Sequence, residues 1–242
     1  MNIKIDLSKT ILQEQNKQDI QIFCESLVSV TGNPVQSIVL YGSAARTDYL
    51  AGVSDINLLI IVERADTAAL QALIEPVTKG RAAGISPLFL TASDLLKFSS
   101  AFSLKYLSIH ESHQTLYGDD PVAGMEISHE SLRLRCRQEL LNLRMRLRRN
   151  YLYSMGHHLA GFLVHSVKGF LELLRLVLYI ENNQLPQRDG TIDAAANLFG
   201  NNMNVVREIL GMKESKLVPE EKIVQTLYDQ YSNLIEDILT RF

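Results

Sequence analysis

Hydrophobic and polar positions follow two different periods along this chain. In its first half, helical stretches alternate with short apolar runs that predict strands at residues 36–41, 55–62 and 85–90. The run at 55–62 is almost continuously apolar, as expected for a strand that is buried on both faces. A further strand is predicted to end at the turn of residues 116–121. The first half therefore predicts an α/β (α+β) domain with a small mixed sheet of four or five strands.

Helices are predicted between these strands and throughout the second half. In the first half they cover residues 8–31 and 66–79, with Asp66 or Thr67 as the cap of the second helix, and helical periodicity resumes at Thr91. The second half shows helical periodicity alone. Its predicted helices are residues 132–153, 157–181, 192–198, 205–210 and 220–240.

The change of period marks a domain boundary near residues 123–127. We expect an α/β domain of residues 1–126, followed by an all-α helical bundle of residues 127–242 that binds a substrate or partner. Clefts between domains are common places for small-molecule sites, so the ligand site is expected between these two domains.

The composition is that of an ordinary globular protein. Of the 242 residues, 46% are hydrophobic and 21% are charged, and the net charge of −3 gives no overall attraction to nucleic acid or anionic lipid. Cys24 and Cys136 lie far apart without spaced partners, which predicts buried, reduced thiols in place of a disulfide or zinc site. The N-terminal residues lack the apolar core of a signal peptide. These features predict a cytoplasmic protein, with a homodimer left open.

One apolar segment, residues 158–180, has the length of a membrane span. His165, Lys168, Glu172 and Arg175 recur in it at spacings of three and four, which places them on one face of a helix. Because a bilayer core disfavours such groups, the segment predicts an amphipathic helix of the bundle, and no membrane partner is expected.

The most informative chemical signal lies between the first two predicted strands. Gly42 and Ser43 end the first strand in a sharp turn, where glycine lets backbone N–H groups approach a phosphate closely. Asp55 opens the next strand, and Asn57 shares its face because strand side chains alternate with period two. Two carboxylates at these places would hold a pair of Mg²⁺ ions. Asn57 offers a neutral oxygen, which a hard cation accepts but attracts more weakly.

These residues resemble the minimal nucleotidyltransferase family of the polymerase-β superfamily, which is akin to the aminoglycoside nucleotidyltransferases. The family pattern is Gly-Ser-x-Ala-Arg-Gly followed by Ser-Asp-Ile-Asp-Leu, and the resemblance covers roughly residues 20–125. Thr47 and Asn57 replace the family glycine and second aspartate, and the third family acid would fall at Ser86 or Pro87. The matching positions are Gly42, Ser43, Ala45, Arg46, Ser54, Asp55, Ile56 and Leu58.

The resemblance implies binding of a nucleoside triphosphate with Mg²⁺, and transfer of its NMP to a hydroxyl of a small molecule or protein. Gly42, Ser43 and Arg46 would bind the nucleotide. A surface pair of Arg46 with Asp48 is the plain structural alternative.

The same resemblance implies that Asp55 and Asn57 are the catalytic metal ligands. Two of the three expected carboxylates are absent from the sequence. The alternative is therefore a degenerate relative that binds a nucleotide or partner without chemistry, as a regulatory or antitoxin-like component.

An arginine-rich helix lies near the start of the second half. Its arginines, from Arg133 to Arg149, are expected mainly on a solvated face, with an anion-binding wall or an RNA contact as sharper alternatives. Nucleic acid is otherwise not expected as a partner.

Acids of the bundle serve as the base in the aminoglycoside-modifying relatives. For Glu139 and Glu172 the plain expectation is pairing with Arg135 and Lys168.

Overall fold

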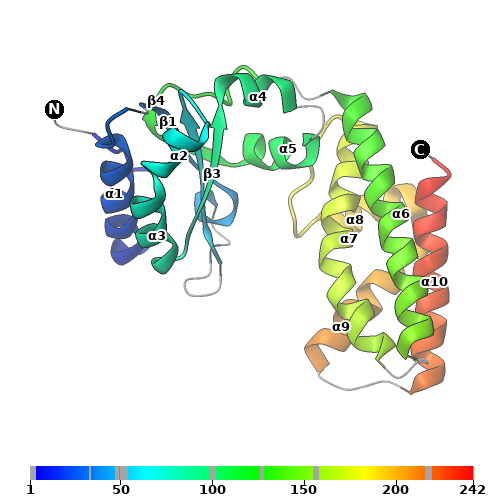
Figure 1. Cartoon of the computed structure of the whole chain (residues 1–242). Coiled ribbons are helices and arrows are strands. Elements are labelled where there is room, and N and C mark those ends of the chain that lie inside the picture. The colour runs from blue at the N-terminus through cyan, green and yellow to red at the C-terminus, as the bar shows by residue number, and fades with distance from the viewer. Residues whose placement is uncertain are drawn as a thin grey trace. The chain divides into compact units, whose positions relative to one another are not determined.

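The computed structural model describes residues 4–32, 34–46, 49, 54–98, 102–125, 128–154, 158–215 and 220–241. The chain separates into two compact units, Met1–Ile127 and Ser128–Phe242 (Figure 1). In the described residues, the first unit combines a sheet with helices and the second is helical throughout. The predicted fold class, a small mixed α/β sheet domain followed by a helical bundle, is confirmed.

A four-stranded mixed sheet forms the centre of the first unit. Its strand order is β3-β2-β1-β4, in which β1 is antiparallel to both neighbours and β2 is parallel to β3. A short 3-10 turn, η1 (Gly42–Ala45), follows β1 directly. The strands are β1 (Val35–Tyr41), β2 (Ile56–Val62), β3 (Ile85–Thr91) and β4 (His113–Gly118).

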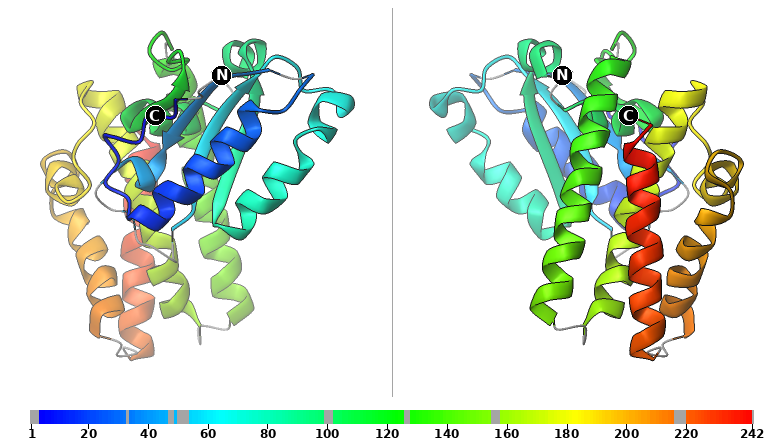
Figure 2. Two further views of the ribbon diagram at one scale, coloured as in Figure 1. Left: turned by 90° about the vertical axis from the view of Figure 1, so that its left-hand side faces the viewer. Right: turned by 90° about the vertical axis from the view of Figure 1, so that its right-hand side faces the viewer.

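Two helices cover one face of this sheet. Helices α1 (Glu14–Val28) and α3 (Ile74–Ala82) lie side by side there (Figure 2). Ile38 and Ile60 point into the core beneath them, and the buried thiol of Cys24 belongs to the same core. Alternation of strand side chains sends the intervening residues to the opposite face.

Helices α4 (Ala92–Phe98) and α5 (Ser103–Glu111) follow β3 along the chain, and the core on the opposite face is smaller. Val39 and Leu59 from the sheet pack there with Tyr106 of α5. This is the face on which the residues of the candidate site lie.

Two predicted helices of the first unit differ from those observed. The helix expected at 8–31 begins only at Glu14, because the preceding segment runs along β4, where the Asp6 N–H donates to the Leu116 carbonyl at 2.9 Å. The helix expected at 66–79 is broken into α2 (Thr67–Gln71) and α3. Proline at position 76 explains the break, since its ring clashes with the carbonyl four residues earlier in a continuous helix.

The second unit is a bundle in which α6 (His129–Ser154), α7 (Leu159–Asn182) and α10 (Glu221–Leu239) run side by side (Figures 1 and 2). Phe170 and Tyr231 join α7 to α10 in an edge-to-face contact with ring centroids 5.1 Å apart. No helix among the described residues has the length and apolar character needed to cross a bilayer. The remaining elements are α8 (Thr191–Phe199), η2 (Gly200–Met203) and α9 (Asn204–Ser215).

Candidate functional site

The turn after β1 depends on glycine at position 42. Gly42 has φ of +77°, a left-handed conformation that costs other residues about 1–2 kcal/mol. The backbone N–H of Arg46 closes the turn on the Ser43 carbonyl at 2.9 Å. A Cβ on Gly42 would lie 3.4 Å from Nδ2 of Asn57, so the turn packs closely against the second residue of β2. The predicted phosphate loop and the predicted metal strand therefore meet.

Asp55 and Asn57 lie at the start of β2, beside this turn. Asp55 is exposed and comes just before the strand, whereas Asn57 is half-buried and pairs with Tyr41 of β1. The Asn57 amide donates a long hydrogen bond of 3.4 Å from Nδ2 to the Asp55 backbone carbonyl. This orientation assigns the nitrogen to the backbone and leaves the amide oxygen as the ligand group.

The register of β2 with β3 decides which residue occupies the position of the third acid. Asn57 pairs with Ser86, whereas Leu58 pairs with Pro87. Because paired residues share a face, Ser86 lies beside Asn57 and Pro87 points to the opposite face. The sequence left both residues open, and the structure selects Ser86. Its hydroxyl is exposed and carries no charge at neutral pH.

An open cavity of about 560 Å³ reaches Asp55 and Ser86 at the edge of the sheet and is otherwise lined from the α3 side, by residues such as Val77, Pro87 and Phe89. Arg81, at the end of α3, also lines it and supplies a positive charge suited to an anionic ligand. Burial, and then the charge of Asp55, raise the pKa of Tyr49 above its usual value, which places this phenol near the carboxylate. Asp55 thus has the access to ligand that the predicted role requires.

Arg46 is half-buried at the end of the turn. Thr47 and Asp48, which follow it, lie outside the described residues. The choice between a phosphate contact and a pair with Asp48 therefore stays a prediction.

The donor set suits one Mg²⁺ and not the pair of ions that two carboxylates would hold. Asp55, Asn57 and Ser86 offer only oxygen atoms, which hard cations prefer, but a single negative charge. Mg²⁺ is commonly bound by one or two carboxylates together with substrate phosphates, and this arrangement matches that case. Among the described residues, no three His, Cys, Asp or Glu side chains gather as metal ligands.

Three further polar residues on this face were missed by the sequence reasoning. Lys105 of α5 places its Nζ 4.7 Å from the centroid of the Tyr41 ring. His113 of β4 pairs with Tyr41, and its Nε2 lies 3.1 Å from Oδ2 of Asp120. The neighbouring turn sequence was recognised, but the position of His113 depends on the register of β4, for which a single sequence contains no signal.

The arginine-rich helix α6 makes several ion pairs inside its own unit. Arg135 lies 2.7 Å from Glu139, which confirms the predicted pair. Arg133 lies 3.6 Å from Glu181 of α7, and Arg144 contacts Glu236 of α10. These pairs favour a structural role for part of the arginine run.

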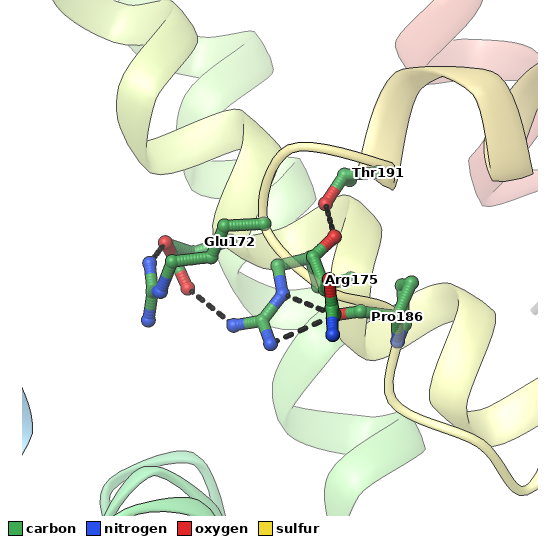
Figure 3. Close-up of polar contacts among 6 residues, drawn as sticks. Glu172, Arg175, Pro186 and Thr191 are labelled. Atoms are coloured by element: carbon green, nitrogen blue, oxygen red, sulfur yellow. Dashed lines mark hydrogen bonds and ion pairs between the residues drawn. The ribbon is translucent and has the colours of Figure 1, made fainter. Parts of the chain in front are cut away.

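The predicted pair of Glu172 with Lys168 is wrong. Glu172 lies 3.3 Å from Nη1 of Arg175 (Figure 3). It also contacts Arg188. The segment after α7 folds back onto that helix, and Arg175 donates from Nε and Nη2 to the Pro186 carbonyl at 3.0 and 2.9 Å. Arg175 is consequently buried, although the periodicity placed it on a solvated face. Glu172 serves as an anchor for this connection.

The arrangement of the sheet and helices is that of a nucleotidyltransferase fold, as a comparison with solved structures shows. Among solved structures, the chain is similar to spectinomycin adenyltransferase AAD(9) from Enterococcus faecialis, determined with ATP and spectinomycin. The TM-score is 0.57 at 12% sequence identity, over 93% of this chain and 100% of the other. Neither a family model nor a curated protein matches the sequence. At this identity the likeness establishes the fold.

Proposed function

We propose that this chain binds a nucleoside triphosphate with one Mg²⁺ and transfers its NMP to a hydroxyl of a small molecule or protein. The observation that carries the proposal is the approach of the Gly42 turn to Asn57, next to an exposed Asp55. A cradle for phosphate and a carboxylate for its cation are the two elements that bind a metal–triphosphate complex.

Each residue has a defined part in this proposal. The backbone of Gly42 and Ser43, the Ser43 hydroxyl and the Arg46 guanidinium hold the phosphates. Asp55 and the amide oxygen of Asn57 hold the cation, which when bound would offset the phosphate charge.

A second candidate is a nucleotide-binding protein without chemistry. It is favoured by the neutral side chains of Asn57 and Ser86, which pair with each other at places where the resemblance to the nucleotidyltransferase family would put carboxylates. Every tenfold loss of rate corresponds to about 1.4 kcal/mol of barrier, so two lost charges are a serious handicap for catalysis. Both candidates share the nucleotide site and differ in turnover.

Two measurements test and separate these candidates. Calorimetry with each of the four common ribonucleoside triphosphates should detect Mg²⁺-dependent binding that Asp55→Ala weakens. Asp19→Ala, on α1 at the opposite face of the sheet, is the matched control and should bind as the unmodified protein does. The absence of heat with all four nucleotides would refute both candidates. Incorporation of label from the α-phosphate into acceptors supports transfer over binding alone.

A further inference from the structure

One row of side chains crosses the whole sheet on the face of the candidate site. The register pairs Asn57 with Ser86 on one side and with Tyr41 on the other. Tyr41 in turn pairs with His113 of β4. Neighbouring strands lie about 4.8 Å apart, so the backbone of His113 is about 10 Å from that of Asn57. His113 on β4 thus lies at one end of this row, and Ser86 on β3 lies at the other end.

The imidazole of His113 is held in one orientation by Asp120. Oδ1 of Asp120 accepts the Val122 backbone N–H at 2.8 Å, and Oδ2 lies 3.1 Å from Nε2 of His113. A carboxylate can only accept, so Nε2 is the donor in this pair and Nδ1 is the ring nitrogen on the other side of the imidazole. Burial by itself would raise the pKa of Asp120, but hydrogen bonds from Val122 and His113 lower it below its usual value. The carboxylate therefore stays charged at neutral pH.

Charged and titratable groups surround His113 from each neighbouring element. Tyr41 comes from β1, Lys105 and His110 from α5, and Asp120 from the turn that follows β4. The Lys105 ammonium lies over the Tyr41 ring, next to His113 in the row, where it can attract an anion. The His113 side chain is 19% exposed, which leaves it within reach of a ligand.

We propose that His113, oriented by Asp120, accepts the proton of the acceptor hydroxyl from the β4 side of the site. The inference rests on the proposed function. In the step, the hydroxyl oxygen forms a bond to the α-phosphorus, and the bond from that phosphorus to the oxygen bridging to the β-phosphate breaks. Pyrophosphate leaves, and the hydroxyl proton moves to Nδ1 of His113. A general base of this kind contributes about 10²–10⁴-fold to a rate.

A purely structural role would have His113 only fasten the turn of Asp120 to β4. His113→Gln separates the two roles, because its amide can still donate to Asp120 but cannot act as a base at neutral pH. His110→Gln is the matched control, since this exposed histidine lies on α5 with its ring centroid 6.5 Å from that of His113.

The first test follows the His113 imidazole by NMR while calorimetry follows nucleotide binding, with ATP and Mg²⁺ as the probe. Bound triphosphate close to His113 should move the imidazole resonances of this residue, since a nearby negative charge changes the electric field at the ring. The resonances of His110 should move less. If ATP binds while the His113 resonances stay in place, the inference is wrong and the proposed function survives. If ATP does not bind, the proposed function itself fails.

The second test measures transfer of labelled NMP. His113→Gln should lower the rate about 10²–10⁴-fold, leave ATP affinity within about twofold, and remove the rise of rate with pH near neutrality. His110→Gln should keep both rate and pH profile. A His113→Gln variant with the unmodified rate and profile would show that the pair with Asp120 only holds the turn.

Discussion

Asn57 of β2 stands directly opposite Ser86 of β3, on the face of the sheet that the Gly42 turn adjoins. Two neutral side chains thus lie beyond the single carboxylate of Asp55, which comes just before β2. The proposed site combines a glycine turn suited to a phosphate with a single negative charge for a cation. Because the site has so little negative charge, an added carboxylate should strengthen cation binding, and this gain can be measured.

Restoring a carboxylate at position 57 should strengthen cation binding. Asn57→Asp adds a negative charge beside Asp55, and we expect about tenfold tighter Mg²⁺-dependent binding of ATP by calorimetry, equivalent to about 1.4 kcal/mol. Asn16→Asp on α1 adds the same charge at the opposite face and is the control. If neither Asn57→Asp nor Asp55→Ala changes the affinity, these residues are not metal ligands.

Removing the left-handed glycine should damage the nucleotide site more than the fold. Gly42→Ala strains a backbone with φ of +77° and puts a methyl 3.4 Å from Nδ2 of Asn57. We expect a loss of about 1–2 kcal/mol of unfolding free energy in urea and a clear loss of ATP affinity. Gly32→Ala is the matched control, because φ there is +87° with no heavy atom within 4 Å of the added carbon. Equal ATP affinity in both variants would contradict a phosphate role for the turn.

The buried arginine of the bundle should matter far more than an exposed one. Arg175→Met leaves the Pro186 carbonyl without its two donors, which costs about 2–3 kcal/mol in chemical denaturation. Arg133→Met removes an exposed pair with Glu181, and its cost should stay below about 1 kcal/mol. Similar losses for the two variants would indicate that the segment after α7 is not anchored by Arg175.

The two thiols should be unreactive in the folded protein. Burial raises the pKa of both Cys24 and Cys136 to about 12, so very little thiolate forms at pH 8. Ellman's reagent should modify neither residue until urea unfolds the chain, whereas an exposed control thiol introduced as Ser29→Cys should react at once. Fast reaction of the unmodified protein without denaturant would contradict the burial of these thiols.

The raised pKa of the two thiols also fixes the direction in which the stability of the fold changes with pH. Because the folded-state pKa of each thiol is raised, its contribution is complete below the unfolded value of about 8.5 and is lost as the pH rises from there towards about 12. Cys24→Ala should flatten this decline in urea unfolding measured between pH 8 and 10. An unchanged pH dependence would show that the thiol at position 24 is not its source.

Local patterns predicted most elements of this chain and the core of its site. The apolar run before Val62 gave β2, the Gly-Ser pair gave the turn, and Asp66 caps α2 through a 2.9 Å bond from the Ala69 N–H, as expected. Each of these features follows from residues adjacent in the chain, whose backbone preferences act over a few positions.

Partners distant in the sequence were decided by the tertiary structure alone. Strand register placed Ser86 beside Asn57 and brought His113 into the same row, and the segment after α7 carried Arg188 to Glu172. A shift of one residue in register would have turned each of these strand side chains to the opposite face. The sequence by itself therefore determined which side chains are able to do chemistry. The packing of the strands determined which of those side chains meet, because contacts across a sheet depend on the burial of both its faces and not on any local run of residues.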